Sequence, residues 1–267
     1  MIIGDVPRRA ESSQVATQLR VIRALFTREL LTRFGTSRIG FVWLLAEPMM
    51  LAMMISTLHW VSGHGVGNGL PTFLFYAMGY TPFVMFRSIV NRGANVINAN
   101  MSLLFHRNIT LLDVAIARNL MEAAVCSMII TIFITVAAIF FNEWPHEPAL
   151  LFCGLMMSAL LAHGLSMLLA ALTCFYEALE RFTHPLTYMM MPISATFYMM
   201  SMVPSETRDL LLINPLVHVH EMNRWAQFGD RVVPYYSIPY VLCWIFGLNL
   251  LGMAGLRAAR SRITLME

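Results

Sequence analysis

Lysine is absent from this 267-residue chain, and charge of either sign is scarce. All 18 basic residues are arginines, and charged residues make up 12% of the sequence, against roughly 25% in soluble globular proteins. Hydrophobic residues make up 58%, and the mean hydropathy is +0.64. This composition excludes a disordered chain, a coiled coil and an ordinary soluble enzyme. It indicates an all-α integral membrane protein that crosses the bilayer several times.

The absence of lysine also excludes several kinds of chemistry. A nucleotide-binding P-loop needs a lysine that reaches the β- and γ-phosphates, and Schiff-base catalysis needs a lysine amine. If the protein uses ATP, a separate chain must therefore hydrolyse it. The net charge of +3 is too small to indicate nucleic-acid binding. The four cysteines form no C-x-x-C motif, so we interpret them as small packing residues and expect no metal or cofactor on this chain.

Five long stretches contain no Asp, Glu or Arg, and the first is divided by the glycine-rich loop Ser62–Pro71. A spanning helix needs about 20 mostly apolar residues. The sequence therefore predicts six spans, at residues 42–61, 72–90, 120–141, 150–173, 184–203 and 237–257. We divide the chain into an N-terminal segment (1–40), a transmembrane domain (41–258) and a C-terminal segment (259–267).

The arginines are unevenly distributed between the two sides of this arrangement. Fifteen lie in the two terminal segments, the 87–119 region and the 174–183 loop. The 204–236 segment has three, and the 62–71 and 142–149 loops have none. Because arginine collects on the cytoplasmic side of a membrane, both termini are expected in the cytoplasm. The N-terminus has no apolar run after Arg8 and Arg9, so we expect no cleavable signal peptide.

Three segments outside the spans have structured patterns. Residues 15–34 carry one apolar stripe and predict an amphipathic helix in the cytoplasmic interface. Arg33 would point toward that stripe, so either the helix has ended there or Arg33 has a buried partner. The cytoplasmic stretch 91–119 is long and partly apolar, which favours a docking region for a cytoplasmic partner. The external segment 204–236 predicts one or two re-entrant or interfacial helices.

Few ionisable groups fall within the spans. Glu47 lies about one turn inside the first span, where a carboxylate is either functional and paired with Arg33 or Arg38, or hydrated at headgroup depth. The run His218 to Glu221 lacks the H-E-x-x-H spacing of a metal site, and we predict polar contacts at the outer surface. No array of acidic residues typical of a proton relay is present, which disfavours an ion-coupled transporter.

Aromatic residues within the spans have two possible roles. They line a sugar-binding pathway, because flat rings stack on sugars, or they belong to the interfacial belt and the packed interior. The pathway candidates are Trp60, Tyr76, Tyr80, Tyr188 and Tyr198. Trp43 and Trp60, near span ends, fit the belt better.

Three stretches resemble one family of transporters. Leu25–Pro48 reads LFTRELLTRFGTSRIGFVWLLAEP and resembles the R-E-x-x-x-R-(Y/F)-x-x-S-x-(L/I)-G-x-x-W-x-x-x-x-P opening of type-2 ABC exporter permeases. Asn108–Arg118 is similar to the loop before the third helix in the capsular polysaccharide export branch. Asn214–Trp225 is similar to that branch's external N-P-L-x-H-x-x-E-x-x-R segment. The chain departs from the family in lacking lysine and in its 22 methionines.

The resemblance implies the type-2 ABC exporter fold, in a homodimer that binds two cytoplasmic ATPase subunits carrying ATP and magnesium. The 91–119 region would couple ATPase closure to transport through Phe105, His106, Arg107 and Asp113, with the 174–183 turn as a second contact. Arg28, Glu29, Arg33, Arg38 and Glu47 would form a cytoplasmic gate near an anionic lipid-linked substrate. Asn214, His218, Glu221 and Arg224 would belong to the external segment.

The function implied is ATP-driven export of a capsular polysaccharide, as a lipid-linked glycan, across the bacterial inner membrane. Export of an O-antigen, a teichoic acid or another lipid-linked polymer is the alternative within the same class. The sequence leaves open whether an outer-membrane or periplasmic export partner docks on the outside. An intramembrane enzyme or a secondary transporter is the alternative of a different class. It would require a catalytic or ion-binding constellation within the spans, and the sequence offers none.

Overall fold

The computed structural model describes residues 14–34, 38–63, 66–67, 69–96, 98–100, 109–176 and 178–265. All regular elements within these residues are helical. The α-helices are α1 (Gln14–Phe34), α2 (Arg38–Val61), α3 (Thr72–Ala94), α5 (Leu111–Phe141), α6 (Pro148–Phe175), α7 (Ala178–Ile193), α8 (Ser205–Leu211), α9 (Pro215–Phe228) and α10 (Ile238–Leu265). Short 3-10 turns lie at Asn98–Asn100 (η1), Met200–Met202 (η2) and Gly229–Arg231 (η3).

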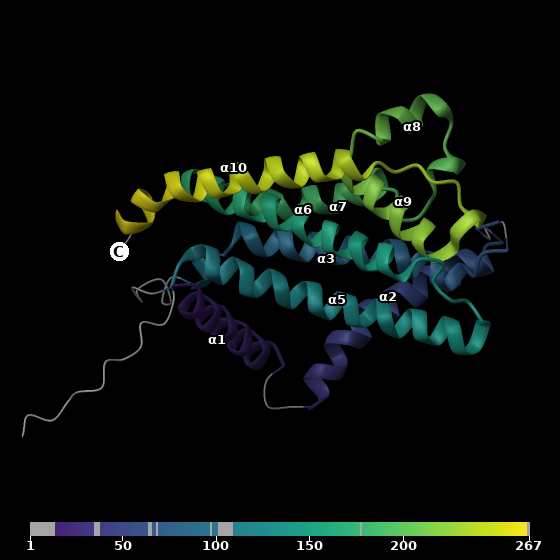
Figure 1. Ribbon diagram of the computed structural model, residues 1–267, viewed down its shortest axis with the longest axis horizontal. Helices are drawn as coiled ribbons and strands as arrows, with labels where there is room; N and C mark the ends of the chain where they lie inside the picture. Colours follow the sequence, from purple (N-terminus) through teal and green to yellow (C-terminus); the bar gives the residue numbers. More distant parts are fainter. Residues whose placement is uncertain are drawn as a thin grey trace, which may run out of the picture.

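The long helices form a bundle around α3, which contacts α2, α5, α6, α7 and α9 (Figure 1). Most of the α3 side chains are buried, because apolar residues occur on every side of this helix. Helices α6 and α10 run side by side, and glycines keep their backbones close: a Cβ on Gly252 would lie 2.7 Å from the Met167 Cβ. The core is therefore filled by side chains from α3 and the helices around it.

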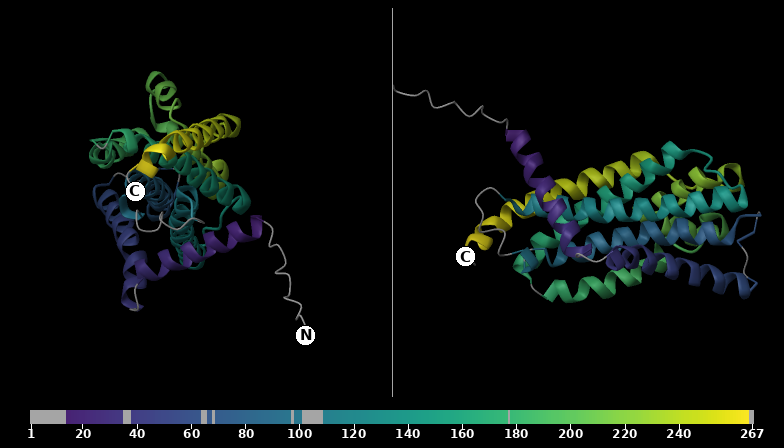
Figure 2. Two further views of the ribbon diagram at one scale, coloured as in Figure 1. Left: turned by 90° about the vertical axis from the view of Figure 1, so that its left-hand side faces the viewer. Right: turned by 90° about the horizontal axis from the view of Figure 1, so that it is seen from below.

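The two ends of the bundle differ. Helix α1 lies across one end, close to the C-terminus, and packs on α5 (Figure 2). The opposite end carries residues 69–71, the 142–147 turn, α8 and α9 (Figure 1). We call these the α1 end and the α9 end. The arginine distribution predicts that the α1 end faces the cytoplasm.

Four helices are long and apolar enough to cross a membrane: α3, α5, α6 and α10 within the described residues. Large apolar side chains on these helices are exposed, among them Phe140, Phe152 and Phe246, as expected for surfaces in contact with lipid. The described apolar part of α2, Met49–Val61, is shorter. The count of six spans stays a prediction.

Two of the predicted spans differ most from the helices observed. The helix expected over 184–203 begins at Ala178 and ends at Ile193, since the chain leaves the helix after Pro192 and Ala195 takes a φ of 58°. Helix α5 begins at Leu111 instead of residue 120, because charged residues in its first turns conceal it from a hydropathy reading. Helix α1 includes Arg33 and ends at Phe34, in agreement with the helix predicted over residues 15–34.

We predict that Gly79→Ala lowers the stability of the protein. A Cβ at Gly79 would lie 1.9 Å from the Thr196 carbonyl oxygen and 2.9 Å from an Arg224 guanidinium nitrogen. Overpacking of this kind costs about 1–3 kcal/mol. A Cβ at Gly247 on α10 has nothing within 4 Å, so Gly247→Ala should be neutral or slightly stabilising. Thermal unfolding of the detergent-purified variants measures both, and equal midpoints would contradict the packing described for α3.

Candidate functional site

Arg224 on α9 is fully buried and donates hydrogen bonds to three backbone carbonyls. One guanidinium nitrogen lies 2.7 Å from the Tyr198 oxygen, and the other lies 2.6 Å from the Ala195 oxygen and 2.8 Å from the Thr196 oxygen. The guanidinium also stacks over Phe75, 4.6 Å from the ring centroid. The planar fork of arginine suits this task because it offers several N–H donors in fixed directions.

These carbonyls need donors because the chain after Ile193 is no longer helical. Buried backbone groups outside regular structure lose their intrahelical partners, and an unpaired one costs free energy comparable to a lost hydrogen bond. The Glu221 carboxylate, 3.3 Å from Arg224, completes the arrangement by accepting from the Met200 backbone N–H at 3.2 Å. Glu221 and Arg224 are both fully buried, so Glu221 makes its polar contacts inside the bundle and not at the surface predicted for the run His218 to Glu221.

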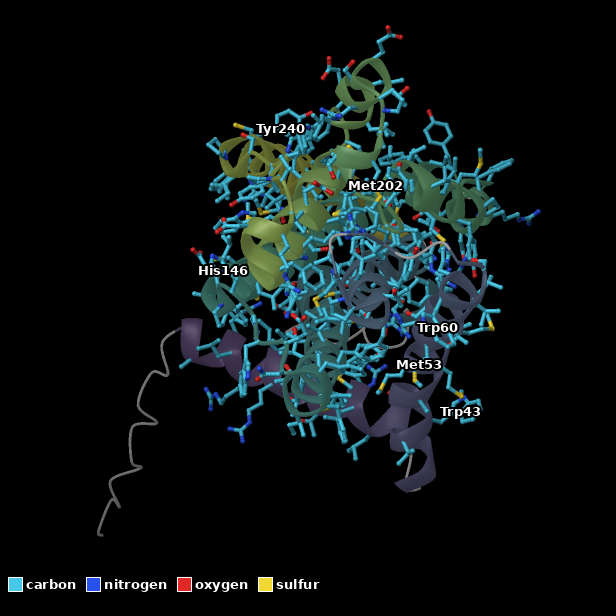
Figure 3. All side chains as sticks on the ribbon, turned by 90° about the vertical axis from the view of Figure 1, so that its right-hand side faces the viewer. Trp43, Met53, Trp60, His146, Met202 and Tyr240 are labelled. Carbon is cyan, nitrogen blue, oxygen red and sulfur yellow. The ribbon has the colours of Figure 1, made fainter. Side chains whose placement is uncertain are left out.

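Arg208 on α8 holds the next part of the same segment. Its guanidinium donates to the carbonyl oxygens of Met200 and Val203, each at 2.8 Å, and to the Tyr235 hydroxyl at 2.9 Å. Two arginines from separate helices thus fix residues 195–203, which we call the arginine-held segment. Figure 3 looks onto the α9 end, where α9 lies among the labelled His146, Met202 and Tyr240.

Asn214 and His218 fix the start of α9. The Asn214 side chain caps the helix by accepting from the Leu216 N–H at 3.0 Å, and its amide donates to the Ile193 carbonyl at 3.1 Å. His218 lies 2.8 Å from the Leu212 carbonyl and accepts from the Ser237 N–H at 3.0 Å. Burial lowers the pKa of His218, so the neutral ring with one donor and one acceptor satisfies both contacts.

At the α1 end, Glu29 joins three helices. This nearly buried carboxylate on α1 lies 3.7 Å from Arg92 on α3 and 3.4 Å from Arg118 on α5. Arg92 also pairs with Glu122 at 2.6 Å. Salt screens the attraction between such charges less when they are partly buried. The network ties α1 to the bundle beside the predicted cytoplasmic gate, where Arg28 is half-buried.

Asp113 forms the capping box of α5. Its backbone N–H donates to the Thr110 hydroxyl, and its carboxylate accepts from the Thr110 N–H at 2.9 Å. The side chain of Gln18 on α1 also donates to Asp113. Phe105, His106 and Arg107 lie outside the described residues, as do the side chains of Arg33, Arg38 and Glu47. The coupling and gating roles of all these residues stay predictions.

The aromatic pathway candidates are divided between the interior and the surface. Tyr76 and Tyr80 are buried in the core and pack on Phe197. Tyr188 and Trp60 are exposed, at 56% and 72%. The Tyr198 hydroxyl donates to the Pro192 carbonyl at 2.6 Å. Tyr188 and Trp60 are thus the most exposed of the five rings, and the pathway role stays a prediction.

Sequence reasoning missed two features of these sites. The role of Arg208 cannot be read from the sequence, because nothing there marks the carbonyl groups to which it donates. The Arg92–Glu122 pair joins α3 to α5 through two residues that lie 30 positions apart in the sequence. One signal was available for α9: Glu221 and Arg224 are three residues apart, a spacing that places both side chains on one helical face.

We predict that Arg224→Met destabilises the protein by about 3–5 kcal/mol, because it leaves a buried carboxylate and three carbonyls without their donor. Arg224→Lys should be intermediate, since one ammonium group cannot replace the planar fork. Arg257→Met is the matched control, because Arg257 is exposed on α10. The measurement is again thermal unfolding in detergent. If Arg224→Met unfolded at the same temperature as Arg257→Met, the burial of this arginine would carry no structural role.

Comparisons with known proteins agree with this architecture. The family model described as ABC-2 type transporter matches residues 20–228. The chain is 32% identical over 242 residues to the capsule polysaccharide export inner-membrane protein BexB of Haemophilus influenzae, covering 90% of this chain and 91% of that protein. It is 34% identical to the capsule polysaccharide export inner-membrane protein CtrC of Neisseria meningitidis (89% and 90% covered). It is 25% identical to the polysialic acid transport protein KpsM of Escherichia coli (87% and 91% covered). The chain belongs to the ABC-2 type transporter family.

Proposed function

We propose that this chain is the membrane-spanning permease of an ABC transporter that exports a capsular polysaccharide across the bacterial inner membrane. One observation carries the proposal: relatives named for capsule polysaccharide export in the inner membrane match about nine-tenths of this chain and of their own length. The four long apolar helices support the membrane location. The quoted motifs Asn108–Arg118 and Asn214–Trp225, which resemble the same branch, agree with this match.

The polymer crosses the membrane between two copies of the chain. The interior of one chain is filled by side chains from α3, α5 and α6, which leaves the outer faces of the bundle for the pathway. A long hydrophilic polymer cannot cross hydrocarbon unaided, so the two copies must supply a polar or aromatic surface that closes at rest. The exposed rings of Tyr188 and Trp60 are the residues we assign to that surface.

ATP hydrolysis takes place on two partner ATPase subunits, because this chain has no lysine to complete a P-loop. ATPase closure biases the permease only through contacts that differ between its open and closed states. We assign those contacts to the 91–119 region at the α1 end. The ion pairs of Glu29 with Arg92 and Arg118 give that end a direct connection from α1 to α3 and α5.

Deletion of the gene tests the proposed function. We expect capsular polysaccharide to disappear from the cell surface and to accumulate inside the cell, because synthesis continues without export. Expression of the intact chain should restore the surface polymer, and the exposed-site variant Arg257→Met should restore it equally. The readout is antibody or lectin staining of intact and of permeabilised cells.

Two outcomes would contradict the proposal. Normal surface capsule after deletion would exclude capsule export. Loss of a different surface glycan, such as O-antigen or a teichoic acid, with the capsule intact would move the substrate to that polymer.

A further inference from the structure

A cavity of about 400 Å³ opens at the α1 end between α3, α5, α7 and η1. It is lined by three arginines, Arg87, Arg92 and Arg118, and by polar side chains that include Asn91, Asn95 and His184. We call it the basic pocket. A second cavity of about 350 Å³ adjoins it, sharing Asn91, Asn95 and His184 and adding Glu180 and Arg181.

The charges around the basic pocket are only partly neutralised. Arg92 and Arg118 pair with Glu29, and Arg92 also pairs with Glu122. Arg87 differs: among the described residues it forms no salt bridge, and its guanidinium stacks on the Tyr188 ring, 4.4 Å from the centroid. Within the same residues, none that lines the basic pocket is acidic. The pocket therefore has a net positive charge centred on Arg87.

The hydrogen-bond donors of the pocket come from three helices. Asn91 on α3 accepts from the Thr187 hydroxyl at 3.0 Å through its amide oxygen, which leaves its NH₂ group as a donor. Arg118 approaches from α5 and His184 from α7. A tetrahedral phosphoryl group, with oxygens pointing in several directions, can accept from donors arranged in this way. A planar carboxylate matches a single arginine fork better than it matches such a cage.

Arg87 lies near the α1 end of α3, a helix that is long and apolar enough to cross a membrane. It is seven residues before the end of α3 at Ala94, which places it about 10 Å along the helix from that end. A charged residue inside a spanning helix is costly unless it has a partner or a function. The phosphoryl group of an amphiphile, held at headgroup depth by its lipid chain, meets this arginine without leaving the membrane.

We propose that the basic pocket binds the phosphoryl group of an anionic amphiphile, with Arg87 as the principal contact. This inference rests on the proposed export function and adds the group by which the permease recognises the lipid-attached end of its substrate. Arg92 and Arg118 add positive charge, and their ion pairs with Glu29 connect an occupied pocket to α1. The same phosphoryl chemistry is present in ordinary anionic phospholipids, so the test separates the two sources.

The test is binding to the full chain, purified in dodecyl maltoside, with dodecyl phosphate as the probe and calorimetry as the readout. We expect saturable binding to the intact chain, weakened about tenfold or more by Arg87→Gln, because the variant loses the charged hydrogen-bond donor of the pocket. Arg87→Lys should retain part of the affinity. Arg257→Gln, on the exposed face of α10, should bind as the intact chain does. Thermal unfolding of each variant confirms that it is folded.

Two further probes separate the sources of the phosphoryl group. Phosphatidylglycerol that binds as tightly as dodecyl phosphate, and with the same dependence on Arg87, would identify a site for membrane phospholipid. Dodecyl phosphate bound in strong preference to both phosphatidylglycerol and inorganic phosphate would identify a site for the lipid-attached end of the substrate. Both results support the phosphoryl pocket.

Equal affinity of the intact chain and folded Arg87→Gln for dodecyl phosphate, or absence of saturable binding, would overturn the proposal. This assay needs neither the ATPase nor the polymer. Its failure is therefore distinguishable from failure of the export function, which is read from surface capsule in the deletion strain.

Discussion

The α9 end depends on one constraint: a break in a helix inside an apolar bundle exposes backbone carbonyls that need hydrogen-bond donors. The chain leaves its helix after Ile193, and Arg224 supplies donors to the carbonyls of Ala195, Thr196 and Tyr198. That requirement explains why α9 is buried among other helices, why Glu221 accompanies its arginine, and why position 79 of α3 is a glycine. The buried polar residues of α9 thus stabilise the fold and do not form an exposed polar surface.

Arginine side chains have a different role at the α1 end. There the arginines face carboxylates and a cavity, and Glu29 joins α1 to α3 and α5 through Arg92 and Arg118. Arginine keeps its charge in both environments and presents its donors in fixed directions, which a lysine ammonium does not. The complete replacement of lysine by arginine is thus compatible with carbonyl binding at one end and ion pairing at the other.

Hydropathy identified where most helices lie, because charge-free runs of about 20 residues have few other uses in a protein. Hydropathy failed where an apolar stretch is not helical and where a helix begins with charged residues. Residues 195–203 contain no charged side chain, yet they form the arginine-held segment, which contains no α-helix, and Pro192 was the available warning. It also missed the first turns of α5, whose Asp113 and Arg118 contact Gln18 and Glu29 of α1. Tertiary contacts such as those of Arg208 leave no periodic signal in the sequence.

In the proposed mechanism, closure of partner ATPases at the α1 end moves a polymer between two copies of this chain. The most direct measurement is purification of the chain after co-expression with its ATPase, followed by subunit stoichiometry and ATPase activity in lipid nanodiscs. The account predicts two permease chains with two ATPase chains, and hydrolysis that rises when the lipid-linked polymer is added. A chain that purifies without an ATPase, or hydrolysis that ignores the polymer, would contradict it.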